Sequence, residues 1–138
     1  MESGRQVWGR VLLVGVAYGV IGVVFAALDD GDHVQLWRLA AWVVSAAVFA
    51  VHIAYEHYRR GNAARATAQH VAGAAAVGAF ALAVAANVHS LLAATPGPQG
   101  RLLLALIVFP VMTALPAFLA ALVGAVALAR LSRRVSRP

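Results

Sequence analysis

The sequence predicts an all-α integral membrane protein, built as a four-helix up-and-down bundle with a kinked fourth helix. Hydrophobic residues make up 62% of its 138 residues and charged residues only 12%, whereas a globular domain is about half apolar and about a quarter charged. Four long uncharged runs each hold the roughly 17 to 25 residues that a helix needs to cross a bilayer core. The distribution of arginine then indicates the direction in which these spans cross.

The uncharged runs predict a single transmembrane domain over residues 1–138. Its spans are expected at about residues 9–28, 36–58, 64–93 and 102–129. Because these spans take up nearly all of the sequence, any binding is expected inside the bundle, at its two ends or on a partner in a larger membrane complex. The absence of cysteine excludes disulfides, thiolate metal sites and thiol redox chemistry.

All eleven basic residues are arginine, and nine of them fall on one predicted side of the membrane. Those nine are Arg5, Arg10, Arg59, Arg60, Arg65, Arg130, Arg133, Arg134 and Arg137. Arginine-rich short loops stay in the cytoplasm, so the sequence predicts a multi-pass protein of the cell membrane with both termini cytoplasmic. This topology and contact with anionic lipid headgroups account for the net charge of +6. Nucleic acid is therefore not an expected partner, whereas the lipid bilayer is.

The first span follows a short basic segment, as a secretory signal peptide does. Its uncharged run, residues 11–28, exceeds the 7 to 15 residues of a signal core, which favours a membrane span. Gly15, Gly19 and Gly22 form a small-residue pattern that lets two helices approach closely in lipid. Two alternatives follow: these glycines pack against another span of the same chain, or they join two copies in a homo-oligomer.

The second span carries its polar residues on one stripe. At 100° per residue, five of them fall within about 60° of one another around the helix. These five are Arg38, Ser45, His52, Glu56 and Arg59. The other faces are alanine, valine, isoleucine and phenylalanine, so the stripe is expected to face protein and not lipid.

A short turn at Gly61 and Asn62 is expected to join the second and third spans. Gly61 suits the end of a helix and Asn62 the cap of the next one. His52 precedes Gly61 by nine residues, and His70 follows it by nine. In an antiparallel hairpin that rises about 1.5 Å per residue, both imidazoles then lie at a similar depth, roughly 13 Å from the turn.

Two interpretations of this hairpin involve no cofactor. In the first, the histidines and Glu56 only hold the two helices together through hydrogen bonds and ion pairs. In the second, His52, Glu56, Gln69 and His70 form a ligand- or proton-binding site between the second and third spans, near the cytoplasmic side. Ionisable groups inside a membrane are costly, which makes them candidates for function.

A third interpretation is a cofactor used in electron transfer. His52 and His70 match the two axial ligands of haem b, and His52, Glu56 and His70 match three ligands of a divalent metal in a helix bundle. Helices joined by a tight turn lie about 8 to 10 Å apart, which leaves little room for a macrocycle. The sequence therefore favours a non-enzymatic binding, transport or accessory subunit. No catalytic residue is predicted, since no nucleophile is paired with a base.

The fourth span is expected to follow a loop at Pro96, Gly97 and Pro98. Its uncharged run, residues 102–129, is longer than a perpendicular crossing requires and contains Pro110 and Pro116. Each proline removes a helical hydrogen bond and tends to bend the helix. The sequence therefore predicts a kink, either a static bend that fits a long helix into the bundle or a hinge.

Overall fold

A computed structural model describes residues 4–28, 31–93 and 99–135, with side chains up to Arg133. The described residues form four α-helices and one π-helix, and they include no strand. The elements are α1 (Gly4–Ala27), α2 (Val34–Ala54), the π-helix η1 (Tyr55–Arg59), α3 (Ala64–Leu92) and α4 (Gln99–Val135). The prediction of an all-α four-helix fold is confirmed. The predicted loop at residues 96–98 lies outside the described residues.

All four helices are long and apolar enough to cross a membrane. The candidate spans are Gly4–Ala27, Val34–Arg59, Ala64–Leu92 and Gln99–Arg133. The first and the last extend beyond the predicted 9–28 and 102–129, because the helices continue through the arginine-bearing turns outside the uncharged runs. Leu13, Ile107 and Val123 are each 70% exposed, an arrangement that suits lipid better than water. These features indicate a multi-pass membrane protein.

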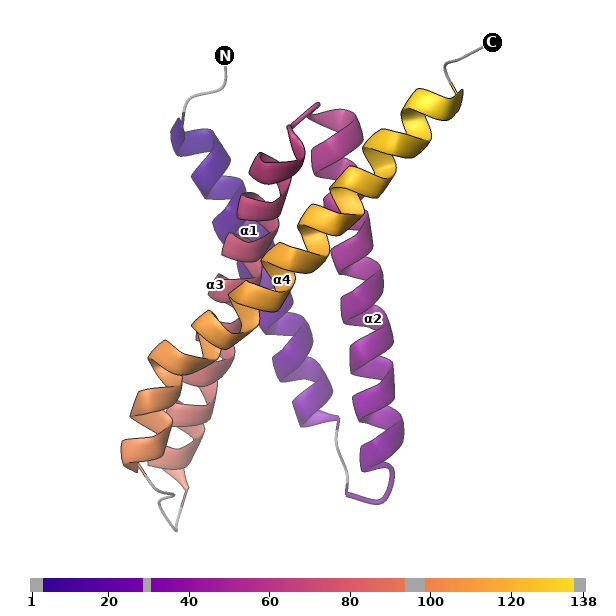
Figure 1. Cartoon of the computed structure of the whole chain (residues 1–138). Helices are drawn as coiled ribbons and strands as arrows, with labels where there is room; N and C mark the ends of the chain where they lie inside the picture. Colours follow the sequence, from indigo (N-terminus) through magenta and orange to yellow (C-terminus); the bar gives the residue numbers. More distant parts are fainter. Residues whose placement is uncertain (1–3, 29–30, 94–98, 136–138) are drawn as a thin grey trace.

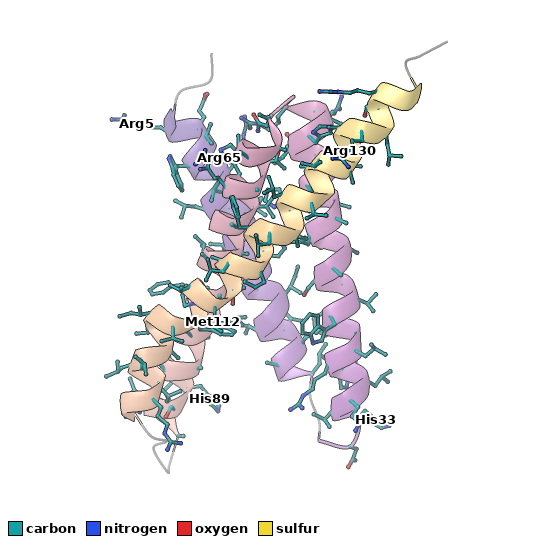
Figure 2. All side chains as sticks on the ribbon, in the orientation of Figure 1. Arg5, His33, Arg65, His89, Met112 and Arg130 are labelled. Carbon is teal, nitrogen blue, oxygen red and sulfur yellow. The ribbon has the colours of Figure 1, made fainter. Side chains whose placement is uncertain are left out.

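The helices run alternately up and down. Figure 1 shows that the beginning of α1 and the end of α4 lie at the same end of the bundle. Arg5, Arg65 and Arg130 lie toward this end, and His33 and His89 lie at the other end (Figure 2). We call the first the arginine-rich end. The structure therefore brings the arginine-bearing segments of three helices together.

α3 is the central helix of the bundle. It packs extensively against α1 and α4, whereas α2 has much less contact with the other helices (Figure 1). α2 is held near its beginning by the rings of Phe25 and Trp37, whose centroids are 6.4 Å apart. Near its end a hydrophobic cluster joins it to α3 and α4, with Ile53, Val71 and Ala121 among its members. Between these two attachments α2 stands away from the bundle.

Glycines of α1 allow its close packing on α3. A Cβ atom added at Gly15 would lie 2.5 Å from the Cβ atom of Val77 and 2.9 Å from the carbonyl oxygen of Ala74. A Cβ atom at Gly19 or Gly22 would come within 2.8 or 2.7 Å of α3 side chains. Real Cβ atoms do not approach other atoms so closely, so only glycine fits at Gly15 and Gly19, whereas at Gly22 the nearest atoms are the methyl groups of Leu82, which can move aside. The structure thus shows the first alternative for these glycines, packing within one chain.

α4 continues as one helix through Pro110 and Pro116. Its beginning is tied to α3 by Asn87, whose Nδ2 donates hydrogen bonds of 2.8 Å to the carbonyl oxygens of Ala83 and Leu102. The Asn87 side chain is buried, and such a bond replaces lost contacts with water. The two prolines therefore do not end the helix, and the kink itself stays a prediction.

Thr67 of α3 offers a test of this packing. Its side chain is fully buried, and its hydroxyl oxygen has no hydrogen-bond partner among the described residues. Valine has the same shape without the hydroxyl, so Thr67→Val is expected to stabilise the protein by about 1 kcal/mol. The measurement is denaturant unfolding in detergent micelles, followed by circular dichroism.

The matched control is Thr113→Val, because the Thr113 hydroxyl donates a 2.8 Å hydrogen bond to the carbonyl oxygen of Phe109. This variant loses a hydrogen bond and is expected to gain no stability. A loss of stability in Thr67→Val would contradict the unpaired state of the Thr67 hydroxyl.

Candidate functional site

Glu56 is the centre of a buried polar cluster at the arginine-rich end. The residue is only 5% exposed. Its Oε2 atom accepts hydrogen bonds of 2.8 Å from Nδ1 of His70 and 2.6 Å from Nδ2 of Asn62. Its Oε1 atom lies 3.9 Å from Nε of Arg60. Because an unpaired charge is costly away from water, these partners explain how the carboxylate is retained inside the bundle.

The local backbone directs Glu56 toward α3. α2 ends in the π-helix η1, which contains Glu56, and the chain then reverses at Gly61 with a φ of +63°. Gly61 ends this segment as predicted, because glycine takes a positive φ without steric cost. The amide nitrogen of Asn62 donates a 3.3 Å hydrogen bond to the carbonyl oxygen of Glu56. π-helical turns are frequent at functional sites.

The predicted role of Asn62 as the cap of α3 is wrong. The residue before α3 is Ala63, and no side chain caps this helix end. The Asn62 side chain donates to the carboxylate of Glu56. A hydrogen bond to a charged acceptor is stronger than one to a neutral acceptor, so the side chain serves the buried carboxylate.

His52 extends the cluster toward α1. Its Nδ1 atom lies 3.3 Å from the hydroxyl oxygen of Tyr18, within hydrogen-bond distance, and its side chain is buried. His52 precedes Glu56 by four residues, so the two side chains are neighbours on one side of this helical segment. Tyr18, His52, Glu56 and His70 therefore form one polar cluster, supplied by α1, α2, η1 and α3. This set of four is called the polar cluster.

Tyr18 is a member of the cluster that sequence reasoning missed. A Cβ atom added at Gly78 would lie 2.7 Å from the Cβ atom of Tyr18, so this glycine leaves the room that Tyr18 occupies. A tyrosine in the middle of an apolar span was a usable signal, because a buried tyrosine hydroxyl usually has a hydrogen-bond partner. The identity of that partner depends on how α1 packs.

Two expectations about the site differ from the structure. Gln69 is exposed and lies outside the polar cluster, because it is rotated by about 100° around the helix from His70. The predicted stripe on α2 is only partly buried: His52 and Glu56 are buried, whereas Arg38 and Ser45 are exposed. Arg38 and Ser45 are exposed because the part of α2 that precedes His52 lies apart from the other helices.

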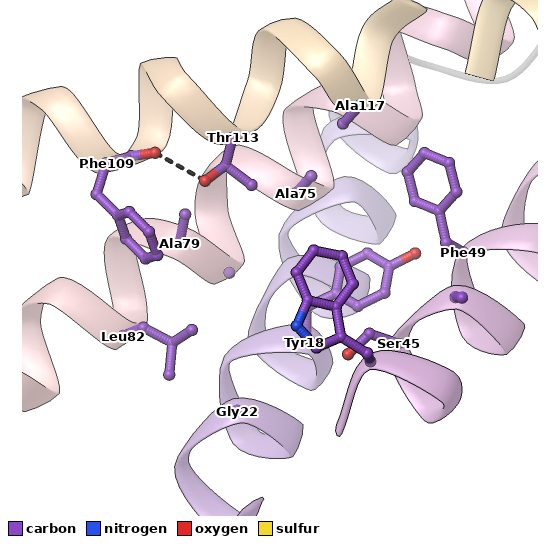
Figure 3. A pocket seen from close by; sticks show the side chains of 13 residues that line it. Tyr18, Gly22, Ser45, Phe49, Ala75, Ala79, Leu82, Phe109, Thr113 and Ala117 are labelled. Carbon is purple, nitrogen blue, oxygen red and sulfur yellow. Dashed lines mark hydrogen bonds between the residues drawn. The ribbon is translucent and has the colours of Figure 1, made fainter. Parts of the chain in front are cut away.

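A cavity of about 410 Å³ lies between α2 and the other three helices (Figure 3). Tyr18 lines it, so the cavity meets the polar cluster at this residue. Most of its wall is aromatic or small and apolar, and Ser45 and Thr113 supply the other side-chain hydroxyls. The remaining lining residues are Gly22, Trp42, Ala46, Phe49, Ala75, Gly78, Ala79, Leu82, Phe109 and Ala117. Such a chamber suits a largely apolar molecule.

In the structure the side chains of the polar cluster bind one another, and the haem alternative stays a prediction. Neither His52 nor His70 lines any of the four cavities described between the helices. Among the described residues, no three histidine, cysteine, aspartate or glutamate side chains are grouped to hold a metal. Glu56 and His70 bind each other directly, and Nδ1 of His52 faces Tyr18. The predicted metal set of His52, Glu56 and His70 therefore does not assemble.

Inside the bundle a carboxylate is paired with one imidazole, Glu56 with His70, and a phenol with another, Tyr18 with His52, and Tyr18 also lines the apolar chamber. Comparison of the chain with protein-family models, with curated proteins and with solved structures finds no match.

Proposed function

We propose that this chain is a non-enzymatic membrane protein of the binding or transport type, in which the polar cluster exchanges protons beside a chamber for an apolar ligand. The observation that carries this proposal is the buried contact between Glu56 and His70. Ionisable side chains inside membrane spans commonly mark proton relays and ligand pathways.

Proton exchange follows from the chemistry of the contact. Oε2 of Glu56 and Nδ1 of His70 are 2.8 Å apart, a distance at which a proton passes directly between a carboxylate and an imidazole. His70 is partly exposed and so connects this contact with the surroundings. The gathering of arginine at this end supports a cytoplasmic location for it.

The chamber supports an apolar ligand. Its volume of about 410 Å³ lies within the range of about 300 to 1,000 Å³ that is usual for small-molecule sites. Tyr18 lies between the chamber and His52, so its hydroxyl is the polar group best placed to contact a ligand and report its presence to the cluster. The ligand class is a largely apolar molecule with one hydrogen-bonding group.

Glu56→Gln tests the proton site. Glutamine has nearly the same shape and keeps hydrogen bonds to its neighbours, but it cannot exchange a proton. In infrared difference spectra between acidic and neutral pH, the wild-type protein in lipid is expected to show a band from a buried carboxyl group that Glu56→Gln lacks. Asp32→Asn is the matched control, since Asp32 is exposed outside the spans.

Proton movement is measured separately in proteoliposomes loaded with the pH-sensitive dye pyranine. The wild-type protein is expected to dissipate an imposed pH gradient faster than Glu56→Gln, and Asp32→Asn is expected to behave as the wild type. Identical infrared spectra for wild type and Glu56→Gln would contradict proton exchange at this residue. A carboxyl band without a difference in proton flux would restrict the function to binding.

A further inference from the structure

A second cavity, of about 580 Å³, opens at the arginine-rich end between the beginning of α1 and η1. It is lined by Val7, Arg10, Tyr55, Arg59, Arg60 and Asn62. Three of these six side chains carry a guanidinium group: Arg10 comes from α1, and the adjacent Arg59 and Arg60 come from the end of the second span. We call this space the basic cavity, to distinguish it from the apolar chamber.

Arginine is the commonest residue in the lining of the basic cavity. The part of the chain that the structure describes contains two acidic residues, Asp32 and Glu56. Asp32 belongs to the opposite end of the bundle, between α1 and α2. Glu56 is 5% exposed and is bound by His70, and its Oε1 atom lies 3.9 Å from Nε of Arg60. The guanidinium groups of Arg10, Arg59 and Arg60 line the cavity, and guanidinium groups are suited to binding an anion.

Aromatic side chains place this cavity at the depth of lipid headgroups. Trp8, Tyr55 and Tyr58 are 65%, 48% and 57% exposed around the same end of the bundle. Tryptophan and tyrosine concentrate at the membrane–water interface. Further along the same helices the exposed residues are apolar, with Leu13 at 70% and Val51 at 67%. A molecule bound in the cavity would therefore meet arginine side chains at one end, and the exposed apolar faces of α1 and α2 would lie beside the rest of it.

We infer that the basic cavity binds the phosphate group of an anionic phospholipid, whose acyl chains lie along the exposed apolar faces of α1 and α2. Guanidinium groups bind phosphate oxygens in a bidentate manner, and basic pockets between membrane helices on the cytoplasmic side bind anionic headgroups. Charge complementarity and interfacial depth together select this occupant. The basic cavity adjoins the proposed proton site, because Arg60 and Asn62 line the cavity and also lie beside the Glu56 carboxylate. Glu56 and His70 themselves do not line the cavity.

The test compares lipid binding by two double variants with equal loss of charge. Arg10→Gln with Arg59→Gln removes two arginines of the basic cavity. Arg5→Gln with Arg65→Gln removes two exposed arginines from the same end that do not line it. Each purified full chain is delipidated in detergent, and its affinities for phosphatidylglycerol and phosphatidylcholine are measured by native mass spectrometry.

The cavity variant is expected to lose roughly tenfold or more of its affinity for phosphatidylglycerol, since each arginine near anionic lipid contributes about 1 kcal/mol. The control variant is expected to keep most of it, and neither variant is expected to change phosphatidylcholine binding. Arg10→Lys with Arg59→Lys keeps the charge without the bidentate geometry and is expected to lie between the two. Circular dichroism establishes that each variant is folded.

Three outcomes overturn the assignment. An equal loss in both glutamine variants would show that general surface charge attracts the lipid. Unchanged affinity in the cavity variant would show that the lipid binds elsewhere. Displacement of phosphatidylglycerol by an equal concentration of glycerol 3-phosphate would show that the site takes a soluble phosphate and not a lipid.

Discussion

His70→Ala is expected to lower the free energy of unfolding by about 3 kcal/mol, because it removes a hydrogen-bond partner from a buried carboxylate. The substitution leaves the Glu56 carboxylate, whose side chain is 7% exposed, with Asn62 as its remaining close partner. Arg60, at 3.9 Å, is too distant for a strong hydrogen bond. The measurement is denaturant unfolding in micelles, with circular dichroism as the signal.

His89→Ala is the matched control for this prediction. His89 lies near the opposite end of the same helix and is exposed (Figure 2), so its replacement is expected to change stability by less than about 0.5 kcal/mol. His70→Gln keeps a hydrogen-bond donor near Glu56 and is expected to lose less than His70→Ala. Equal stability of His70→Ala and the wild type would show that the imidazole does not hold the carboxylate.

Gly15→Leu is expected to destabilise the protein by at least about 2 kcal/mol, because overpacking a tight interface forces the backbones apart. Even the Cβ atom would lie 2.5 Å from Cβ of Val77 and 2.9 Å from the carbonyl oxygen of Ala74. The carbonyl belongs to the backbone of α3, so the clash cannot be relieved by a change of rotamer. α1 would have to move away from α3.

Gly9→Leu is the control on the same helix, since no atom lies within 4 Å of a Cβ atom added there. Leucine favours helix over glycine by up to about 1 kcal/mol, so this variant is expected to be neutral or slightly stabilised. Unfolding of both variants is measured over a range of protein concentrations. A loss in Gly15→Leu that depends on concentration would point to packing between chains and would contradict the intramolecular contact.

Part of the candidate site follows from local sequence. His52 and His70 are equally spaced around Gly61, and because each helical residue adds a fixed rise, this spacing predicts that the two imidazoles lie at a similar depth in the hairpin. Gly61 ends its segment as predicted, and Glu56 falls one turn from His52. The error at Asn62 has a physical reason: its cap preference is a local property, whereas the buried carboxylate that attracts its side chain is positioned by packing with α3.

Tyr18 shows what local reasoning could not reach. Its partner, His52, is 34 residues away and on another helix. The contact depends on the approach of α1 to α3 through Gly15 and Gly78, and on the position of α2. The pattern of polar and apolar residues around a helix predicts which side of it contacts protein. The pattern does not predict which other helix it contacts or how closely the two helices pack.

The sequence by itself determined the four helices, their alternating direction and the gathering of arginine at one end, because length, apolar content and charge are properties of each segment alone. Only the tertiary structure decided how Glu56 is paired, which side chains join it, and where the apolar chamber and the basic cavity lie. These features arise between helices. α1 packs closely on α3 where its glycines face that helix, whereas α2 lies apart from the other helices over much of its length. Both features depend on how all four helices pack together.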